Sequence, residues 1–308
     1  MIDSRDLVSI VVNCHNSEKF VEECINSIIQ QSYKNFEIIV WDNNSTDRTK
    51  EIISQLSITE KRIKFYKGES FLTLGSARNH ALLKCSGDWI AFLDSDDLWD
   101  YNFLSDQISA LKNIKNEFFG FGHVTIFNSK ELPLIRNKNI ERSVSVKSNI
   151  FHSLLRGNFI YFSSLVISRS ALTYVEKFND LLVQAEDYEL LLRLTQKYQA
   201  LQTGHAYYRI HANNTSKKQN ESLYIETLEI LNNYMKYRPA KIAFANCVLR
   251  YFIFSVKSKS ILKYYGNIRQ SNYIYLYFCI GLAFYFYSIP KKIFRRIITF
   301  RISCFPKV

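Results

Sequence analysis

Short runs of mostly apolar residues alternate with helix-like segments through the first hundred residues, and a polar cluster follows most of the runs. The runs have the length of β-strands, and continuous apolar runs are typical of strands that are buried on both faces. They lie at residues 7–12, 36–41, 62–66 and 89–93. Because strands and helices alternate, the sequence predicts an α/β fold with a mostly parallel sheet and helices on both faces.

The segments between these runs supply the expected helices. Residues 17–31 place their apolar side chains on one helical stripe, and Ser17 is the expected N-cap. Helices are expected at residues 17–31, 45–56, 75–85 and 185–198, and further strands at residues 119–127 and 161–168.

Basic residues are distributed unevenly along the chain, whose net charge is +12. Residues 230–308 contain 14 Lys and Arg and no Asp or Glu, whereas the first 229 residues contain 26 basic and 28 acidic residues. We therefore predict a catalytic domain at residues 1–229 and a basic, aromatic-rich helical tail at residues 230–308.

The composition of the tail favours an anionic membrane surface as its partner. Residues 270–290 are uncharged and long enough to span a bilayer, but the five tyrosines among them prefer the interface. Helices that lie on the membrane are favoured over a single span and over a helical packing lobe. Nucleic acid is not an expected partner, because the tail has no recognised nucleic-acid-binding motif.

The cysteines and the N-terminus indicate where the chain works. The six cysteines show no close pairing, and the polar start of the chain does not read as a signal peptide. Together with the basic tail, these features predict a cytoplasmic protein that is peripheral on the inner face of the cell membrane.

The polar clusters after the apolar runs are the candidate site, because ligands of parallel sheets bind at the carboxyl ends of the strands. Asp94 and Asp96 can point at one position, and their oxygens suit Mg²⁺ or Mn²⁺. Such a cation completes its shell with substrate phosphates and would offset the repulsion among Asp94, Asp96 and Asp97. A phosphorylated substrate is therefore expected.

Residues 7–104 and 158–216 contain five diagnostic stretches in the order VSIVVNCHNSEKFVEECINSIIQQSYKNFEIIVWDNNSTDRT, GSARNHAL, GDWIAFLDSDDLW, AEDYELLLRL and YRIHANNTS. With these stretches the chain resembles family 2 glycosyltransferases, which are inverting enzymes with the GT-A fold. The resemblance implies a GT-A fold and Mn²⁺ or Mg²⁺ as cofactor. It also implies transfer of a sugar from a nucleotide-diphosphate-sugar donor to an acceptor hydroxyl with inversion.

The resemblance also implies roles for individual residues, with Arg78 facing the diphosphate and Asp187 acting as the catalytic base. Nucleotide binding is expected at Asn16, Asp42, Asn43, Arg78, Asp94 and Ser95. Metal binding is expected at Asp96 and His211, and acceptor or sugar contacts at Glu186, Asn158 and Asp97. Glu186 is also the rival candidate for the base.

Two features bear on the identity of the substrates. Asn43 replaces the second acid of the family's usual Asp-Asp pair, and its amide offers a donor and an acceptor to a base edge. A UDP-sugar is the expected donor. The basic tail suggests a glycan or lipid-linked acceptor used in the synthesis of cell-surface polysaccharide.

Two other functions fit parts of the pattern. A catalytically inactive homologue could act as a binding or scaffold protein, although the candidate residues Asp94, Asp96, Asp187 and Arg78 are all present. A sugar-phosphate nucleotidyltransferase uses a similar sheet, but it should have a glycine-rich loop after the first strand. The segment NCHNSEKF contains no glycine.

Overall fold

The computed structural model describes residues 6–112, 118–128, 133, 143–147, 150–212, 214 and 221–258. The chain divides into two compact units, Met1–Gln219 and Asn220–Val308. The boundary expected from the charge, after residue 229, falls inside helix α8 (Glu221–Asn232). The position after which acidic residues are absent therefore differs from the boundary between the two compact units.

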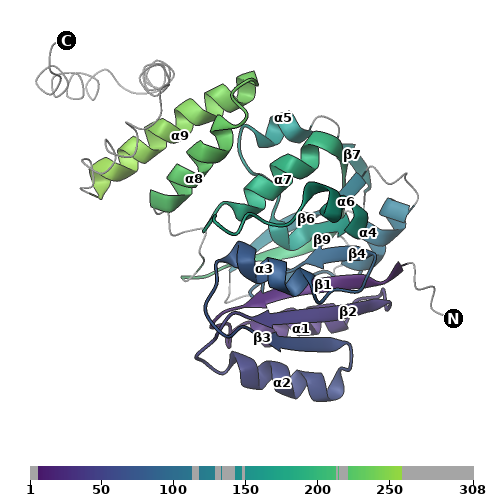
Figure 1. The fold of residues 1–308 in the computed structure, drawn as a ribbon. Coiled ribbons are helices and arrows are strands. Elements are labelled where there is room, and N and C mark those ends of the chain that lie inside the picture. The colour runs from purple at the N-terminus through teal and green to yellow at the C-terminus, as the bar shows by residue number, and fades with distance from the viewer. Residues whose placement is uncertain are drawn as a thin grey trace, which may run out of the picture. The chain divides into compact units, whose positions relative to one another are not determined.

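The first half of the larger unit is the predicted parallel sheet. Strands β1 (Val8–Cys14), β2 (Phe36–Asp42), β3 (Ile63–Lys67) and β4 (Trp89–Phe92) are parallel, in the order β3-β2-β1-β4. Helices α1 (Val21–Ile29), α2 (Thr49–Thr59) and α3 (Leu74–Leu82) connect them (Figure 1). These elements confirm the α/β prediction for this part of the chain.

The second half adds mixed strands to the same sheet, in the order β4-β8-β6-β9-β5, with β7 paired to β9. Strand β8 is antiparallel to β4 and β6, whereas β6 and β9 are parallel. The strands are β5 (Leu98–Trp99), β6 (Phe118–Asn128), β7 (Ser145–Lys147), β8 (Leu165–Ser168) and β9 (Gln199–Ile210). The helices are α4 (Phe103–Lys112), α5 (Ile150–Leu154), η2 (Phe162–Ser164), α6 (Arg169–Val175) and α7 (Glu186–Lys197).

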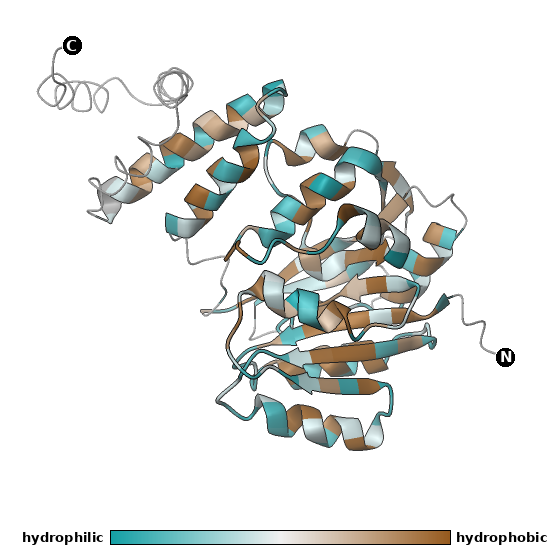
Figure 2. Cartoon of the chain, in the orientation of Figure 1, coloured by the Kyte–Doolittle hydropathy of each residue, from teal (hydrophilic) through white to brown (hydrophobic). Residues whose placement is uncertain are grey.

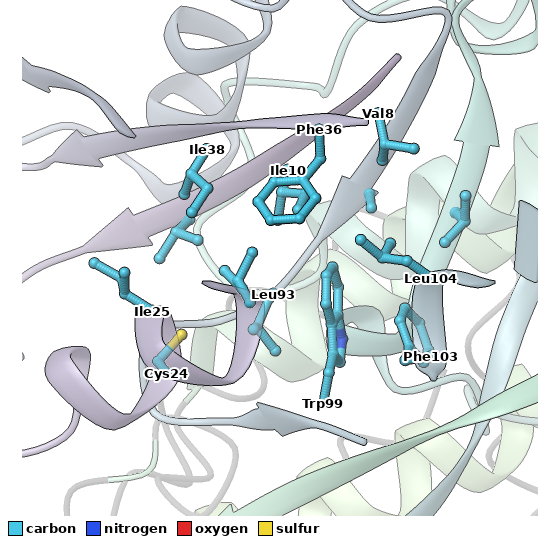
Figure 3. Packing of buried hydrophobic residues seen from close by; sticks show 14 of the residues in the cluster. Val8, Ile10, Cys24, Ile25, Phe36, Ile38, Leu93, Trp99, Phe103 and Leu104 are labelled. Atoms are coloured by element: carbon cyan, nitrogen blue, oxygen red, sulfur yellow. The ribbon is translucent and has the colours of Figure 1, made fainter. Parts of the chain in front are cut away.

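Helices cover both faces of the sheet, as the continuous apolar runs predict. Helices α1 and α4 pack on one face, and α3 packs on β1 and β2 from the other side. Figure 2 shows the apolar residues concentrated along the strands, and Figure 3 shows the packing with α1 and α4. That cluster includes Val8, Ile10, Val12, Cys24, Ile25, Ile28, Phe36, Ile38, Val40, Phe103 and Leu104.

Helix α1 begins at Val21 and not at Ser17, so the prediction that Ser17 caps the helix is wrong. The backbone carbonyl of Ser17 accepts the N–H groups of Phe20 and Val21, which closes a turn before the helix. The Ser17 hydroxyl instead lies 2.8 Å from the hydroxyl of Ser95. Ser17 therefore joins the loop after β1 to the loop after β4.

A buried carboxylate, Glu37, links four segments of the sheet. It accepts hydrogen bonds from the Ser9 hydroxyl and from the backbone N–H and hydroxyl of Ser86, and it pairs with Lys64 at 2.6 Å. Burial of Glu37 alone would raise its pKa, but these donors outweigh burial and lower the pKa to about 2. Glu37 therefore stabilises the fold mainly while it is ionised.

We predict that Glu37→Gln lowers the free energy of unfolding at neutral pH. The difference between the ordinary pKa and about 2 corresponds to at most about 3 kcal/mol. The pKa of Glu37 is lower in the folded than in the unfolded chain. The loss in free energy of unfolding should therefore be complete above the unfolded pKa and disappear as the pH falls towards about 2. Urea unfolding of both proteins at several pH values measures it. Exposed Glu51 supplies the control Glu51→Gln, and an equal deficit there would contradict the prediction.

The second unit contains α8 and α9 (Arg238–Lys257), which pack on each other. The ring of Tyr224 stacks on that of Tyr251, with 5.5 Å between the centroids, and the Tyr251 hydroxyl donates to Glu221 at 2.6 Å. In the part of the chain that the structure describes, no helix has both the length and the apolar character needed to cross a membrane. Residues 270–290, the candidate membrane segment, lie outside the described residues.

Candidate functional site

The predicted polar clusters meet at one edge of the sheet, where β1, β2 and β4 end. The backbone N–H of Asn43 donates to the carbonyl of Cys14 at 2.8 Å, and the side chain of Asn16 accepts the N–H of Thr46 at 2.9 Å. The Ser17–Ser95 contact adds the loop after β4. Residues that are about 80 positions apart in the chain thus form one site, as the parallel sheet predicts.

Asp42 and Asn43 lie at the end of β2 in different surroundings. One oxygen of the buried Asp42 carboxylate accepts the N–H and hydroxyl of Ser45, and the other has no hydrogen-bond partner among the described residues. Asn43 donates to the carbonyl of Leu72 at 2.9 Å and accepts its N–H at 3.0 Å. In this structure the Asn43 amide therefore holds the segment before α3, and its role in reading a base remains a prediction.

The acidic loop after β4 has a protein partner for each carboxylate. Asp94 accepts a hydrogen bond from Arg78 at 3.0 Å, and Asp96 lies 2.8 Å from Nε2 of His211. Asp97 is fully buried and is held by the Ser163 hydroxyl and by the backbone N–H of Arg209. Side chains and backbone groups of the protein thus offset part of the repulsion among these carboxylates, which a metal alone was expected to offset.

Two of these supporting residues are absent from the sequence-based site. The Ser163 hydroxyl contacts both the Asp97 carboxylate and the Asp94 backbone N–H. Arg209 donates through Nε to the carbonyl of Asp96 at 2.7 Å and through Nη2 to Glu23 at 2.6 Å. No local motif marks either residue; the only available signal is that Arg209 stands in the stretch YRIHANNTS, next to other candidate residues.

The burial of Asp97 corrects one expectation. Its side chain has no exposed surface, and both of its oxygens have partners inside the protein. Burial and the neighbouring acids raise its pKa well above the ordinary range. The structure therefore gives Asp97 the role of fixing the loop, and the side chain is not placed to contact a sugar.

Arg78 bridges the acidic loop and the start of helix α7. Its guanidinium donates to Asp94 at 3.0 Å and to Glu186 at 2.8 Å, and it lies 4.2 Å from the ring centre of Phe162. Only 3% of Arg78 and 3% of Glu186 are exposed. In this structure Arg78 thus faces two carboxylates and not open solvent, so the expectation that it faces a diphosphate is not supported by its position.

The two acids at the start of α7 differ in exposure. Burial raises the pKa of Glu186 to about 7, while the positive charge of Arg78 acts in the opposite direction. Asp187 is partly exposed, and burial also raises its pKa against the effect of Arg78. Because Glu186 is committed to Arg78, Asp187 is the better placed of the two to meet a substrate.

The donor set fits a divalent cation that binds substrate phosphates. Asp96 and His211 converge on each other, with 28% and 14% of their side chains exposed. Among the described residues, no group of three His, Cys, Asp or Glu side chains forms a complete metal cage. Mg²⁺ and Mn²⁺ sites that use few protein ligands and several phosphate oxygens match this arrangement.

Asn158 is the other residue that was expected to contact a sugar, and its side-chain hydrogen bond lies within its own loop. It is exposed in the loop between α5 and η2, and its side-chain oxygen accepts the N–H of Ile160 at 3.1 Å. A contact between Asn158 and a sugar remains a prediction.

Comparison with known proteins assigns the chain to a family. A family model described as Glycosyl transferase family 2 matches residues 9–173, which is more than half of the 308 residues. The chain belongs to glycosyl transferase family 2. This membership confirms the resemblance and makes the chain a glycosyltransferase, and it argues against the nucleotidyltransferase alternative. The match begins within β1, includes β2 to β4 and the acidic loop, and ends before α7.

Two curated glucosyltransferases from Escherichia coli are similar to this chain over most of its length. WfgD, a UDP-Glc:alpha-D-GlcNAc-diphosphoundecaprenol beta-1,3-glucosyltransferase, is 35% identical over 61% of this chain and 69% of its own. WfaP, described by the same activity, is 31% identical over 71% of this chain and 83% of its own.

Solved structures of a family 2 fold support the architecture. The crystal structure of S. aureus TarS 1–349 in complex with UDP-GlcNAc superposes with a TM-score of 0.63 and covers 84% of this chain and 80% of its own. The two sequences are 20% identical, so the likeness shows the shared GT-A fold alone.

Proposed function

We propose that this family 2 member is an inverting glycosyltransferase that uses Asp187 as its base. The observation that carries the proposal is the bridge from Asp94 through Arg78 to Glu186, the neighbour of Asp187. It ties the acidic loop of the donor site to the first turn of α7. A donor sugar at the acidic loop and an acceptor hydroxyl at Asp187 would therefore lie close to each other.

The residues at the site divide the chemistry between them. Asp187 accepts the proton of the attacking hydroxyl, which displaces the nucleoside diphosphate from the opposite face of the sugar. Asp96 and His211 would hold the divalent cation that family members generally use. That cation would supply positive charge for the leaving diphosphate. Arg78 acts as a positioning residue because it fixes Asp94 and Glu186 with respect to each other.

The proposed substrates follow the relatives and the sequence. WfgD and WfaP are named for UDP-Glc and a GlcNAc-diphospho lipid, and TarS was solved with UDP-GlcNAc. We propose a UDP-sugar as donor and a lipid-linked or glycan acceptor in polysaccharide biosynthesis.

The release of nucleoside diphosphate from a panel of nucleotide sugars, with and without acceptor, tests this function. Acceptor-dependent release of UDP is expected, with a product of inverted anomeric configuration. Nucleotide-sugar binding without turnover of any donor would favour the inactive homologue.

Metal dependence of nucleotide binding gives the next prediction. Because Asp96 is a proposed ligand, UDP should bind the wild-type chain more tightly with Mn²⁺ than with EDTA, and Asp96→Ala should remove that difference. Titration calorimetry measures both affinities. Exposed Asp88 precedes β4 and supplies the control Asp88→Ala, which should keep the metal effect. Equal UDP affinity of the wild-type chain with and without metal would contradict the assignment.

Membrane association is a proposal that rests on the charge of the tail. Residues 259–308 contain nine Lys and Arg and no Asp or Glu. Each basic residue near an anionic bilayer contributes about 1 kcal/mol, so the full chain should float with anionic liposomes. A chain that ends at residue 258 keeps α8 and α9 and should remain in the soluble fraction. If it floats as well as the full chain, residues 259–308 are not the anchor.

A further inference from the structure

A cleft of about 450 Å³ opens on the larger unit beside strands β6, β7 and β9. Its walls are mainly aromatic and aliphatic, with a lysine and a glutamine as polar groups. They are formed by Phe121, Gly122, Val124, Lys147, Phe159, Tyr161 and Gln202. The volume is within the range of small-molecule sites, and an apolar lining with a few polar groups is their usual character.

The segment before β8 links one wall of the cleft to the site. Tyr161 lines the cleft, while the next residue, Phe162, lies under the guanidinium of Arg78. Ser163 then holds Asp97 and the backbone of Asp94. On the other side, Tyr161 packs on Tyr208 at 4.9 Å between ring centroids. Consecutive residues therefore connect the cleft to the acidic loop.

The polar groups of the cleft show what it can bind. Lys147 is partly exposed on β7 and has no ion-pair partner in the described part of the chain. Phe159 is 47% exposed although it is a large apolar side chain, and its ring lies edge-on to that of Phe121, with 6.4 Å between the centroids. A lysine without an ion pair among the described residues, in the same cleft as the exposed ring of Phe159, is complementary to a ligand that carries an anionic group next to a sugar ring or an alkyl chain.

We propose that this cleft binds the acceptor, and that the acceptor is a sugar carried on a phosphate or diphosphate. Lys147 pairs with the phosphate, and Phe159 and Tyr161 pack against the apolar face of the sugar or the start of the alkyl chain. The inference rests on the proposed glycosyl transfer but assigns a separate set of residues. None of them belongs to the predicted donor or base positions.

Direct binding tests the assignment without turnover. Two probes are used with the full chain in the presence of UDP and Mn²⁺: octyl-diphospho-N-acetylglucosamine and the neutral octyl N-acetylglucosaminide. Lys147→Gln should weaken binding of the diphosphate probe about tenfold and leave the neutral probe unchanged. Phe159→Ala should weaken both probes to a similar extent. Lys61→Gln, an exposed lysine in the turn between α2 and β3, should change neither.

The affinity for UDP separates the acceptor phosphate from the donor phosphate. It should be the same in wild-type chain and Lys147→Gln. A parallel loss of UDP affinity would place Lys147 at the donor and overturn the proposal, as would equal binding of the diphosphate probe to wild-type chain and Lys147→Gln. Absence of probe binding to the wild-type chain would overturn it as well. UDP release with other acceptors reports on the proposed function independently of these results.

Discussion

Arg78→Met is expected to lower the free energy of unfolding by about 3–5 kcal/mol, because it removes the only described cationic partner of two carboxylates. Methionine keeps much of the apolar contact with Phe162 and Phe178 but leaves the Glu186 side chain, which is 4% exposed, without its ion pair. Stability is lost because Glu186 either stays ionised as an uncompensated buried charge or must take up a proton. Chemical denaturation at neutral pH measures it.

An exposed arginine provides the matched control. Arg48 pairs with Glu51, but 74% and 67% of their side chains are exposed. Arg48→Met should therefore change stability by less than about 1 kcal/mol. The double variant Arg78→Met with Glu186→Gln should recover part of the loss, because the second change removes the stranded charge. Equal stability of Arg78→Met and Arg48→Met would show that the bridge contributes little to the fold.

The bridge also affects activity if it aligns the two halves of the site. Without Arg78, Asp94 and Glu186 lose their common partner, so the acidic loop and the first turn of α7 are no longer held together. Turnover should then fall even at saturating donor, beyond any loss of folded protein. Activity per folded molecule separates the two effects.

The parallel half of the fold was predictable because each of its strands and helices can be recognised from a short stretch of sequence. Each strand from β1 to β4 is a mostly apolar run, and each is separated from the next by a helix. The twelve-residue strand β9 was missed, since its sequence QALQTGHAYYRI mixes polar and apolar residues without clean alternation. Its position in the sheet depends on pairing with β6, which begins more than 80 residues earlier.

The candidate site likewise combines residues that local sequence identifies with residues that only the tertiary fold brings together. Asp94, Asp96 and Asp187 stand in recognisable stretches, so their sequence neighbours suffice to nominate them. The partners that hold the acidic loop, Ser163 and Arg209, come from 66 and 112 positions away from Asp97. Such pairings depend on the tertiary fold, and neither the buried state of Asp97 nor the commitment of Glu186 to Arg78 can be read from local spacing.

Asp187→Asn is expected to reduce kcat by about 10²–10⁴-fold, which is the usual contribution of a positioned general base. Asparagine keeps the size of the side chain but cannot accept a proton at neutral pH. Donor affinity should change little, since Asp94, Asp96 and His211 are untouched. Burial raises the pKa of Asp187, so wild-type turnover should fall as the pH drops through that raised pKa.

Two further variants decide whether the effect belongs to Asp187. Asp180→Asn changes an exposed acid shortly before α7 and should leave kcat unaltered. Glu186→Gln should be milder than Asp187→Asn, because glutamine can still accept the hydrogen bond from Arg78 and adjacent helix residues point about 100° apart. Measurements of kcat and donor affinity for all three variants compare the two acids directly. If Glu186→Gln abolishes turnover while Asp187→Asn remains active, the base is Glu186, and if both retain activity, the start of α7 does not perform the proton transfer.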